Sequence, residues 1–468
     1  MTRRSFLSAS SAAPAFAAAP APQSTPPPAA KPNVIWLVAD QHRAQAISCN
    51  GDPNVHTPNI DNYSELGVNF ENAVSGFPLC CPFRGTMLTG RYPHHCVPGH
   101  EYPLPKGQPT IAEPFKQAGY HTGYFGKWHV DGFHESQGRA AMHIIPPERR
   151  GGFDTWVGYE NNNSQWDCWV HGGQGADAFH YRLPGYETDE LTNLFIGYLK
   201  DRAQDRKPFF GVLSVQPPHN PYVAPEEFMG RFHPADLEMR PNVPQIDSVQ
   251  QTARRELAGY YAMIENWDWN IGRIRQALDQ TGLAQDTHIV IFSDHGDMHG
   301  SHGMYRKTNP FEESIRVPFL IAGERQKYDG RKTTRVPTLI NAADIAPTTL
   351  GLCGLNAPSW MEGSDYSGRR LSDRPQVSNP DSAYLQNVIP TGHGHSINKP
   401  YRGVVTADGW KYVAFEGVSW LLYNLAEDPY EQANLAHNNA YRAVRKRLIE
   451  QVRQWAADTG DEFALPAD

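Results

Sequence analysis

Four apolar segments of the chain each run directly into polar or charged side chains. Segments 34–39, 123–126, 209–215 and 287–293 are short and bounded by polar turns, which is typical of strands buried on both faces of a parallel sheet. Ligands of such sheets bind outside the carboxyl ends of the strands, so the side chains that follow can meet in one crevice. They belong to Asp40-Gln41, Lys127-Trp128-His129, His219 in the run 217–222, and Asp294-His295. One such residue alone would more often serve a turn, but together they could hold a cation, bind an anion and transfer protons.

A cysteine-containing motif lies elsewhere in the N-terminal half. Cys80 stands two residues before Pro82 and four before Arg84, and the chain continues into Leu88-Thr89-Gly90-Arg91. Taken alone, Cys80 and Cys81 could be two small buried hydrophobic residues beside a proline turn. Further motifs accompany them: Thr57-Pro58-Asn59-Ile60-Asp61, Lys307 at the end of the run 303–307, and the segment 312–318.

In this order along the chain, the motifs resemble those of the type I sulfatases, members of the alkaline-phosphatase-like superfamily. The resemblance covers essentially the whole chain after residue 32, and it implies an α/β fold with a large, mostly parallel sheet flanked by helices. It also implies that Cys80 is oxidised to formylglycine by a cytoplasmic maturation enzyme and then serves as the nucleophile. Phe83 stands where the family usually has a small residue, so we expect it to affect how efficiently Cys80 is modified.

Hydrolysis of a sulfate ester needs a catalyst that neutralises the ester oxygens, attacks the sulfur and protonates the leaving oxygen. The resemblance implies that Arg84 and Lys127 anchor the hydrated aldehyde, while His129 assists removal of its second hydroxyl proton. It further implies that Lys307 and His219 bind the sulfate, with His219 as the group that protonates the leaving oxygen.

The resemblance also implies one divalent cation, held by Asp40, Gln41, Cys80 after its modification, Asp294 and His295. The family usually supplies three aspartates and an asparagine, whereas in this chain Gln41 takes one aspartate position and His295 takes the asparagine position. Because oxygen ligands still predominate, calcium is the first expectation, with manganese or zinc as alternatives. This ligand set also resembles the phosphonate monoesterase and phosphodiesterase branch of the superfamily, which is the alternative function.

The substrate is expected to be a sulfated small molecule, and a carbohydrate sulfate is favoured. Residues 153–182 carry aromatic and amide side chains: Trp156, Tyr159, Asn161, Asn162, Asn163, Trp166, Trp169 and His171. Such groups suit the C–H surfaces and hydroxyls of a sugar ring. Packing of a long loop is an equal alternative, because tryptophan is so often largely buried. A secreted binding protein whose cysteine is never converted is a further alternative, and the intact Asp and Lys motifs argue against it.

Helical patterns separate the apolar segments. Thr188 is expected to cap one helix with an apolar face. A second helix is expected over residues 252–278, with Trp267 and Trp269 in the core. The alternation of strands and helices predicts an open sheet with helices on both sides.

The pattern changes after about residue 370. Segments 401–406 and 410–415 predict a β-hairpin around a short turn, followed by a third strand at 420–423. A closing amphipathic helix is expected from near Tyr441. These features predict a small C-terminal α+β subdomain over residues 371–468, an antiparallel sheet with its closing helix, beside a catalytic domain over residues 33–370.

The charge balance argues against nucleic acid as a partner. The chain of 468 residues has 42 Lys and Arg against 50 Asp and Glu, a net charge of −8, so an anionic substrate must be held by a local cluster of cations. Cysteine is sparse, with six in the chain. If Cys80 is converted, an odd number remains, and Cys81 is expected to stay buried and unpaired.

Residues 1–19 are typical of an export signal. Arg3-Arg4 and Phe6-Leu7 precede an alanine-rich stretch, and this pair of arginines resembles a bacterial twin-arginine signal. The apolar part is too short for a membrane span, which needs about 20 apolar residues. Residues 20–32, mostly Pro and Ala, are expected to be a linker. The mature protein is therefore expected to be soluble and either periplasmic or secreted.

Overall fold

Ten strands form a large mixed sheet whose five central strands run parallel. The computed structural model describes residues 31–323 and 334–467, so the predicted export signal and most of the predicted linker lie outside the described residues. The strand order is β10-β2-β9-β8-β1-β7-β3-β4-β5-β6, with parallel pairing from β8 to β4. The strands are β1 (Asn33–Ala39), β2 (Val68–Phe70), β3 (His121–Lys127), β4 (Thr155–Tyr159), β5 (Trp169–Gly172), β6 (Phe179–Arg182), β7 (Phe209–Ser214), β8 (Thr287–Ser293), β9 (Phe319–Gly323) and β10 (Thr334–Val336).

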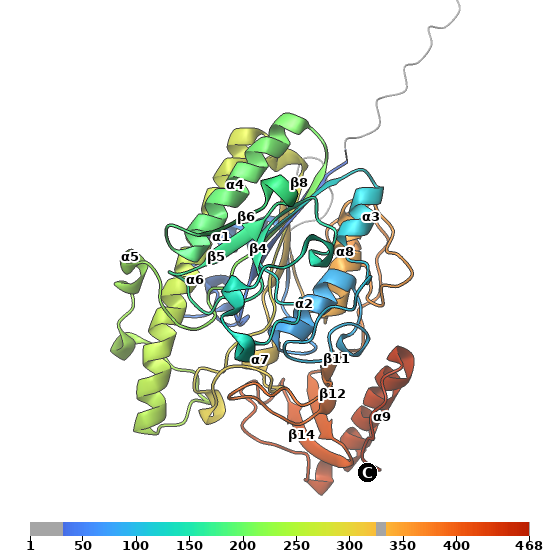
Figure 1. Ribbon diagram of the computed structural model, residues 1–468. Helices are drawn as coiled ribbons and strands as arrows, with labels where there is room; N and C mark the ends of the chain where they lie inside the picture. The colour runs from blue at the N-terminus through green and yellow to red at the C-terminus, as the bar shows by residue number, and fades with distance from the viewer. Residues whose placement is uncertain (1–30, 324–333, 468) are drawn as a thin grey trace, which may run out of the picture. The chain divides into compact units, whose positions relative to one another are not determined.

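Helices cover both faces of this sheet (Figure 1). Helices α1, α4 and α6 pack on one face, and α2, α3 and α8 pack on the other. The helices of this region are α1 (Pro58–Leu66), α2 (Cys80–Thr89), α3 (Ala112–Gln117), α4 (Glu187–Asp205), α5 (Glu226–Met229), α6 (Asp247–Thr281), α7 (Glu312–Ile315) and α8 (Ile345–Leu352). The predicted α/β class, with a mostly parallel sheet flanked by helices, is confirmed.

Strand β1 shows why the sheet is buried on both faces. Val34, Trp36 and Val38 pack with α2, α3 and α8, whereas Ile35 and Leu37 pack with α1, α4 and α6. Successive side chains of a strand point to opposite faces, and every residue of β1 is buried. A strand in this position needs a continuous apolar run, which is why it is recognisable in the sequence.

A second, antiparallel sheet lies near the C-terminal end. It contains β11 (Ser382–Asn387), β12 (Tyr401–Thr406), β13 (Trp410–Phe415) and β14 (Val418–Asn424), and α9 (Arg442–Thr459) packs against it. The predicted hairpin, third strand and closing helix are confirmed. Strand β11 is not predicted, because its polar ends leave only three apolar residues in the run. Among the described helices, none combines the length and apolar character that a membrane crossing needs.

Two details of the predicted helices are wrong. Thr188 does not cap α4, because the helix begins one residue earlier, at Glu187, with Tyr186 at the N-cap position. Trp269 is 45% exposed, whereas Trp267 is buried as predicted. Residues two apart in an α-helix point about 200° away from each other, so the two indoles stand on opposite sides of α6.

Candidate functional site

The carboxyl ends of β8, β1, β7 and β3 lie next to one another at one edge of the large sheet. The last residues of β1 and β8 pair with each other, so Asp40 and Asp294, which follow them, lie side by side. The register between β3 and β7 brings Lys127 to the same edge. Side chains from separate parts of the sequence therefore meet at this edge because parallel strands in register end together.

Cys80 is the first residue of helix α2 and lies at this edge. Its sulfur is 3.1 Å from His295 Nε2 and 3.6 Å from Asp40 Oδ1. Pro82 fits the first turn of α2, where N–H groups have no partner within the helix. Cys81 is buried, and within the described residues all six cysteines are free thiols. The N-terminus of a helix stabilises negative charge, so an anionic group bound next to position 80 would be stabilised by α2.

Four buried side chains form a group that could hold a metal ion. Ligand atoms of Asp40, Cys80, Asp294 and His295 lie within 4.8 Å of one another. His295 Nδ1 is 3.0 Å from the carbonyl of Gly296, so Nδ1 carries the proton and Nε2 keeps a lone pair for a cation. Two carboxylates, an imidazole and an oxygen in place of the Cys80 sulfur suit a divalent cation. These residues fit the cation that the sequence predicts.

The Gln41 side chain connects two other site residues. Its Oε1 accepts a hydrogen bond from Lys307 Nζ at 2.7 Å, and its Nε2 donates to Asp297 Oδ2 at 2.6 Å. Its backbone N–H donates to Asp294 Oδ1 at 2.9 Å from a left-handed conformation with φ of 71°. Such a conformation in a non-glycine residue costs on the order of 1–3 kcal/mol and persists only where its surroundings fix it. Gln41 is therefore held in place from both its backbone and its amide.

Arg84 and Lys127 bring buried positive charge to the two carboxylates. Arg84 Nη2 is 3.1 Å from Asp40 Oδ2 and 3.3 Å from Asp294 Oδ2. Its Nη1 donates to the carbonyl of Lys127 and to the hydroxyl of Ser214. Lys127 Nζ is 2.7 Å from Asp40 Oδ2. Burial would raise the pKa of Asp40, but the cations around it, Lys127 first, hold that pKa well below its usual value. Burial would likewise lower the pKa of Lys127, yet Asp40 raises it, so the ammonium stays charged.

Lys307 and His219 form a hydrogen-bonded pair. Lys307 Nζ is 2.8 Å from His219 Nε2, and His219 Nδ1 is 2.7 Å from the carbonyl of Asn220. Nδ1 therefore carries the imidazole proton, and Nε2 accepts from the ammonium. Burial and the charge of Lys307 lower the pKa of His219 well below its usual value. The imidazole of His219 is therefore neutral, and Lys307 Nζ beside it can donate a further hydrogen bond to an anion.

His129 follows β3 but does not belong to the metal-capable group. It is buried, its φ is 56°, and its Nδ1 has no hydrogen-bond partner among the described residues. Burial and the charge of Lys127 lower the pKa of His129 well below its usual value, so the imidazole is neutral. Its neighbours are Cys81 and His100. A neutral imidazole with a free ring nitrogen can accept a proton.

Asp297 is a buried anchor to which the sequence motifs assign no role. It accepts hydrogen bonds from the Gln41 amide at 2.6 Å, the Tyr222 hydroxyl at 2.5 Å and the backbone N–H of Arg306 at 2.9 Å. It therefore holds Gln41, which in turn contacts Lys307. The available signal was the second carboxylate three residues after Asp294.

Residues 153–182 serve mainly to build the sheet. Trp156 and Tyr159 are buried in β4, and His171 is buried in β5. Trp169 is half-buried, and Trp166 has 47% of its surface exposed. For most of these aromatic side chains the packing alternative is therefore correct.

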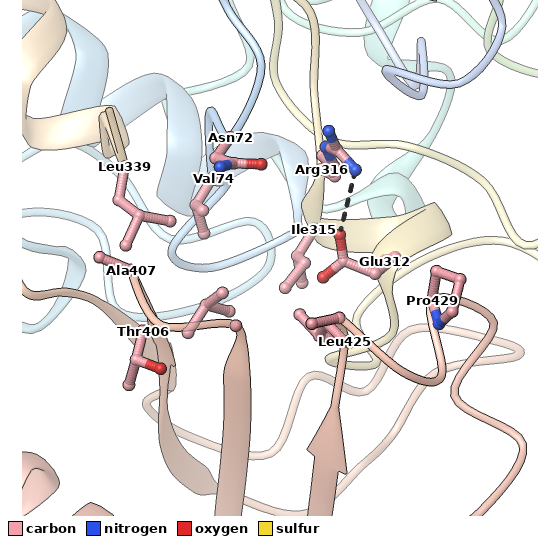
Figure 2. A pocket seen from close by; sticks show the side chains of 13 residues that line it. Asn72, Val74, Glu312, Ile315, Arg316, Leu339, Thr406, Ala407, Leu425 and Pro429 are labelled. Atoms are coloured by element: carbon pink, nitrogen blue, oxygen red, sulfur yellow. Dashed lines mark ion pairs between the residues drawn. The ribbon is translucent and has the colours of Figure 1, made fainter. Parts of the chain in front are cut away.

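A pocket apart from these residues lies between α7 and the turn that joins β12 to β13 (Figure 2). Its lining includes Val74, Leu339 and Leu425, and Glu312 and Arg316 pair with each other at 3.8 Å beside it. The residues that line it include none of the predicted site residues. The chemistry of the strand ends therefore does not extend into this pocket.

Two protein-family models match the chain. The family described as "Sulfatase" matches residues 32–355. The family described as "N-sulphoglucosamine sulphohydrolase, C-terminal" matches residues 300–458. Together they span both sheets of the fold.

Individual proteins match over nearly their full length. The chain is 35% identical to an "Ulvan-active sulfatase" of Formosa agariphila, over 92% of this chain and 82% of that protein. It is 30% identical to an "Endo-4-O-sulfatase" of Bacteroides thetaiotaomicron, over 90% of both. The solved structure of the sulfatase yidJ from Bacteroides fragilis superimposes with a TM-score of 0.83 at 27% identity, over 94% of this chain and 98% of that one.

Proposed function

The chain belongs to the sulfatase family and is a sulfuric ester hydrolase, and from this premise we propose that it hydrolyses sulfate esters of a carbohydrate through a formylglycine at position 80. The observation that carries this proposal is the place of Cys80, at the start of α2 and among Asp40, Asp294 and His295. A sugar substrate is supported by the match to a family named for N-sulphoglucosamine.

The cation would be held by Asp40, Gln41, Asp294 and His295 together with the modified residue 80. Calcium is expected first, and manganese or zinc are the alternatives. When bound, the cation would neutralise the oxygens of the ester and lower the pKa of a neighbouring hydroxyl. For Gln41 this role requires its amide oxygen to leave Lys307, to which it is hydrogen-bonded in the structure.

The remaining site residues would orient groups and move protons. Formylglycine, as its hydrate, would supply one hydroxyl as the nucleophile and a second hydroxyl from which the aldehyde is regenerated. Asp294 would accept the proton of the first hydroxyl, and His129, whose Nδ1 has no hydrogen-bond partner among the described residues, would accept that of the second. Arg84 and Lys127 pair with the two carboxylates and would fix the hydrate beside them.

Lys307 and His219 would act on the sulfate and the leaving oxygen. The ammonium of Lys307 binds the anionic ester, since Gln41 and His219 use only part of its capacity to donate. The leaving oxygen would receive its proton from His219 Nε2, which would first take one from Lys307 Nζ, since His219 Nδ1–H is hydrogen-bonded to the carbonyl of Asn220. Loss of the second hydroxyl proton would break the bond between the carbon of residue 80 and the sulfate oxygen, and water would add to the aldehyde to restore the hydrate. Two protons are removed, at Asp294 and His129, and one is delivered to the leaving oxygen, so the reaction of the ester with water releases one proton.

A panel of matched substrates tests the proposed function. We expect the highest kcat/KM for sulfate monoesters, sulfated sugars included, and measurable turnover of phosphodiesters and phosphonate monoesters. The promiscuity is expected because a neutral amide, Gln41, replaces a carboxylate near the bound anion. Turnover of the phosphorus esters above that of every sulfate would instead support a phosphonate monoester or phosphodiester hydrolase.

Loss of the metal is expected to destabilise the protein. A ligand that binds only the folded state stabilises it by about 2.7 kcal/mol at a hundredfold excess over its Kd, so added Ca²⁺ should raise the Tm of chelator-treated enzyme. Asp294→Asn should remove this rise, and Asp344→Asn, which changes a buried aspartate elsewhere, should keep it. Differential scanning calorimetry measures both. An equal rise in Asp294→Asn would exclude Asp294 as a ligand.

Export is expected to depend on Arg3 and Arg4. If they form a twin-arginine signal, the chain folds and is modified by the maturation enzyme in the cytoplasm before it crosses the membrane. Changing both to lysine should leave full-length precursor in the cytoplasm, measured by fractionation and immunoblotting. Normal export of that variant would point to the general secretory route.

A further inference from the structure

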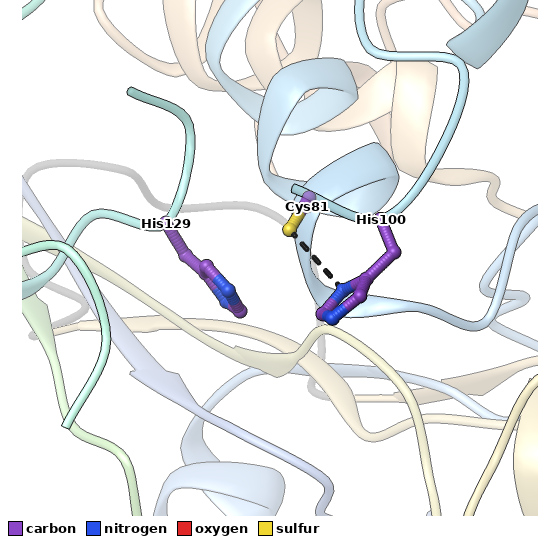
Figure 3. Close-up of side chains that lie close together, drawn as sticks. All are labelled: Cys81, His100 and His129. Carbon is purple, nitrogen blue, oxygen red and sulfur yellow. Dashed lines mark hydrogen bonds between the residues drawn. The ribbon is translucent and has the colours of Figure 1, made fainter. Parts of the chain in front are cut away.

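A second group of metal-ligand side chains lies beside the predicted catalytic residues. The ligand atoms of Cys81, His100 and His129 all lie within 4.8 Å of one another, and Cys81 Sγ is 3.8 Å from His100 Nδ1. Figure 3 shows the imidazole of His129 pointing toward the other two side chains. Zinc bonds of about 2.0–2.3 Å place neighbouring ligand atoms about 3.3–3.8 Å apart in a tetrahedral site. The group is therefore close to the spacing that a tetrahedral ion requires.

One neighbouring residue supports two of these three ligands. The backbone N–H of Glu101 donates to Cys81 Sγ at 3.3 Å, and Glu101 Oε1 is 3.8 Å from His100 Nε2. A hydrogen bond to the sulfur and a carboxylate behind the imidazole are the interactions that orient metal ligands. Glu101 has a left-handed backbone with φ of 56°, which its contacts to the chain near His134 help to fix. The outer contact to the sulfur is thus already in place, whereas the carboxylate lies near the imidazole but beyond hydrogen-bond distance.

Burial, and then nearby charges that include Lys127 and Arg84, lower the pKa of His129. Among the described residues, however, no ion pair with a cation occupies the ligand atoms of this group. A comparable group, His302 with Glu313 and Glu431, is already neutralised, because Arg240 pairs with Glu313 and Lys411 pairs with Glu431. In the Cys81 group, by contrast, the Nδ1 of buried His129 has no hydrogen-bond partner among the described residues.

We propose that Cys81, His100 and His129 form a binding site for a thiophilic transition metal, with Zn²⁺ as the expected ion. One sulfur and two imidazole nitrogens suit zinc and leave a fourth position for water, whereas calcium and magnesium prefer oxygen ligands. Binding releases the Cys81 thiol proton to solvent. The site is distinct from the predicted calcium site, although Cys80 and Cys81 are neighbours in α2.

Occupation of this site would inhibit the enzyme. A zinc ion bound to the ring nitrogen of His129 would prevent that residue from accepting a proton. This consequence depends on the proposed role of His129 in sulfate-ester hydrolysis, but metal binding itself does not. The two can therefore be tested separately.

Cobalt(II) absorption tests the site directly. In calcium-saturated Cys80→Ala protein, which lacks the other thiol at the site, one equivalent of Co²⁺ should give a thiolate-to-cobalt charge-transfer band. Cys81→Ser in the same background should abolish the band, whereas Cys168→Ser, which changes another buried thiol, should keep it. Absence of the band, or its persistence in the Cys81→Ser protein, would overturn the site.

Zinc inhibition tests the consequence. In the mature enzyme, His100→Gln is expected to raise the Zn²⁺ concentration for half-inhibition by about tenfold or more, because ligand and outer contacts each contribute strongly to metal affinity. His95→Gln, an imidazole outside the group, should leave it unchanged. Equal zinc sensitivity in His100→Gln and in the unchanged enzyme would refute the proposal that zinc at this site inhibits the enzyme. A cobalt band without zinc inhibition would keep the metal site and remove His129 from the proposed catalysis.

Discussion

Cys80→Ala protein is expected to show no sulfate-ester hydrolysis above background and no labelling by aldehyde-selective reagents. The side chain of residue 80 stands at the start of α2, against His295 and Asp40, where the proposed nucleophile would form. Loss of a covalent nucleophile typically lowers kcat by a factor on the order of 10⁴ or more. The measurements are turnover of an aryl sulfate and mass spectrometry of the labelled peptide, after co-expression with a maturation enzyme.

Cys353→Ala is the matched control for this experiment. Cys353 is also a buried free thiol, but it follows directly after α8 and belongs to none of the motifs that form the candidate site. Its variant should keep both the aldehyde and the activity. Substantial turnover by Cys80→Ala would refute the formylglycine mechanism, and inactivity of both variants would indicate a general loss of folding.

The central sheet could be predicted because its strands leave a simple pattern. Strand β1 is buried on both faces, so every position from Val34 to Ala39 must be apolar, and the polar residue that follows marks the carboxyl end. All six residues of the edge strand β11 are buried too, but three of them are polar, so the run is not apolar. These polar side chains are hydrogen-bonded to Trp455, Asp461 and Ile397, which no local pattern of the strand shows.

The sequence pattern indicates which residues form the candidate site, but it does not indicate the hydrogen bonds between them. Asp40, Asp294 and Lys127 are recognisable because each follows an apolar run. The hydrogen bonds of Gln41 to Lys307 and Asp297 depend on a left-handed backbone and on the fold between residues 41 and 297. No local pattern encodes such contacts, because they arise only when the strands are assembled.

Phe83 shows that a residue within a catalytic motif can also be required for packing. Its place in the motif predicts an effect on the modification of Cys80. In the structure, however, the ring is buried in the core, and its centroid lies 6.4 Å from that of the Phe292 ring. Truncating such a phenylalanine typically costs about 3–5 kcal/mol. Packing against the sheet therefore accounts for an aromatic residue at this position, and its influence on the modification stays a prediction.

Arg84→Lys is expected to lower kcat/KM by about 10³-fold while the protein remains folded. The guanidinium of Arg84 contacts Asp40 and Asp294 and also donates to the carbonyl of Lys127 and the hydroxyl of Ser214. A lysine keeps the charge but cannot reproduce this fork, because its ammonium is a single point donor. The two carboxylates would then lose their common partner, and the groups around residue 80 would no longer be held in one arrangement. Loss of one preorganised electrostatic contact at an active site typically costs about 3–4 kcal/mol of transition-state stabilisation.

Arg402→Lys separates this catalytic effect from the general effect of changing a buried arginine. Arg402 is also buried and pairs through two nitrogens with Asp461, but it belongs to the C-terminal sheet. Both variants should lose stability in denaturant titrations, because each gives up hydrogen bonds to a buried carboxylate, worth about 1.5–3 kcal/mol apiece. Only Arg84→Lys should lose activity. If the two variants keep equal kcat/KM, Arg84 stabilises the fold alone, and the ordering of Asp40 and Asp294 must come from Lys127 and the bound cation.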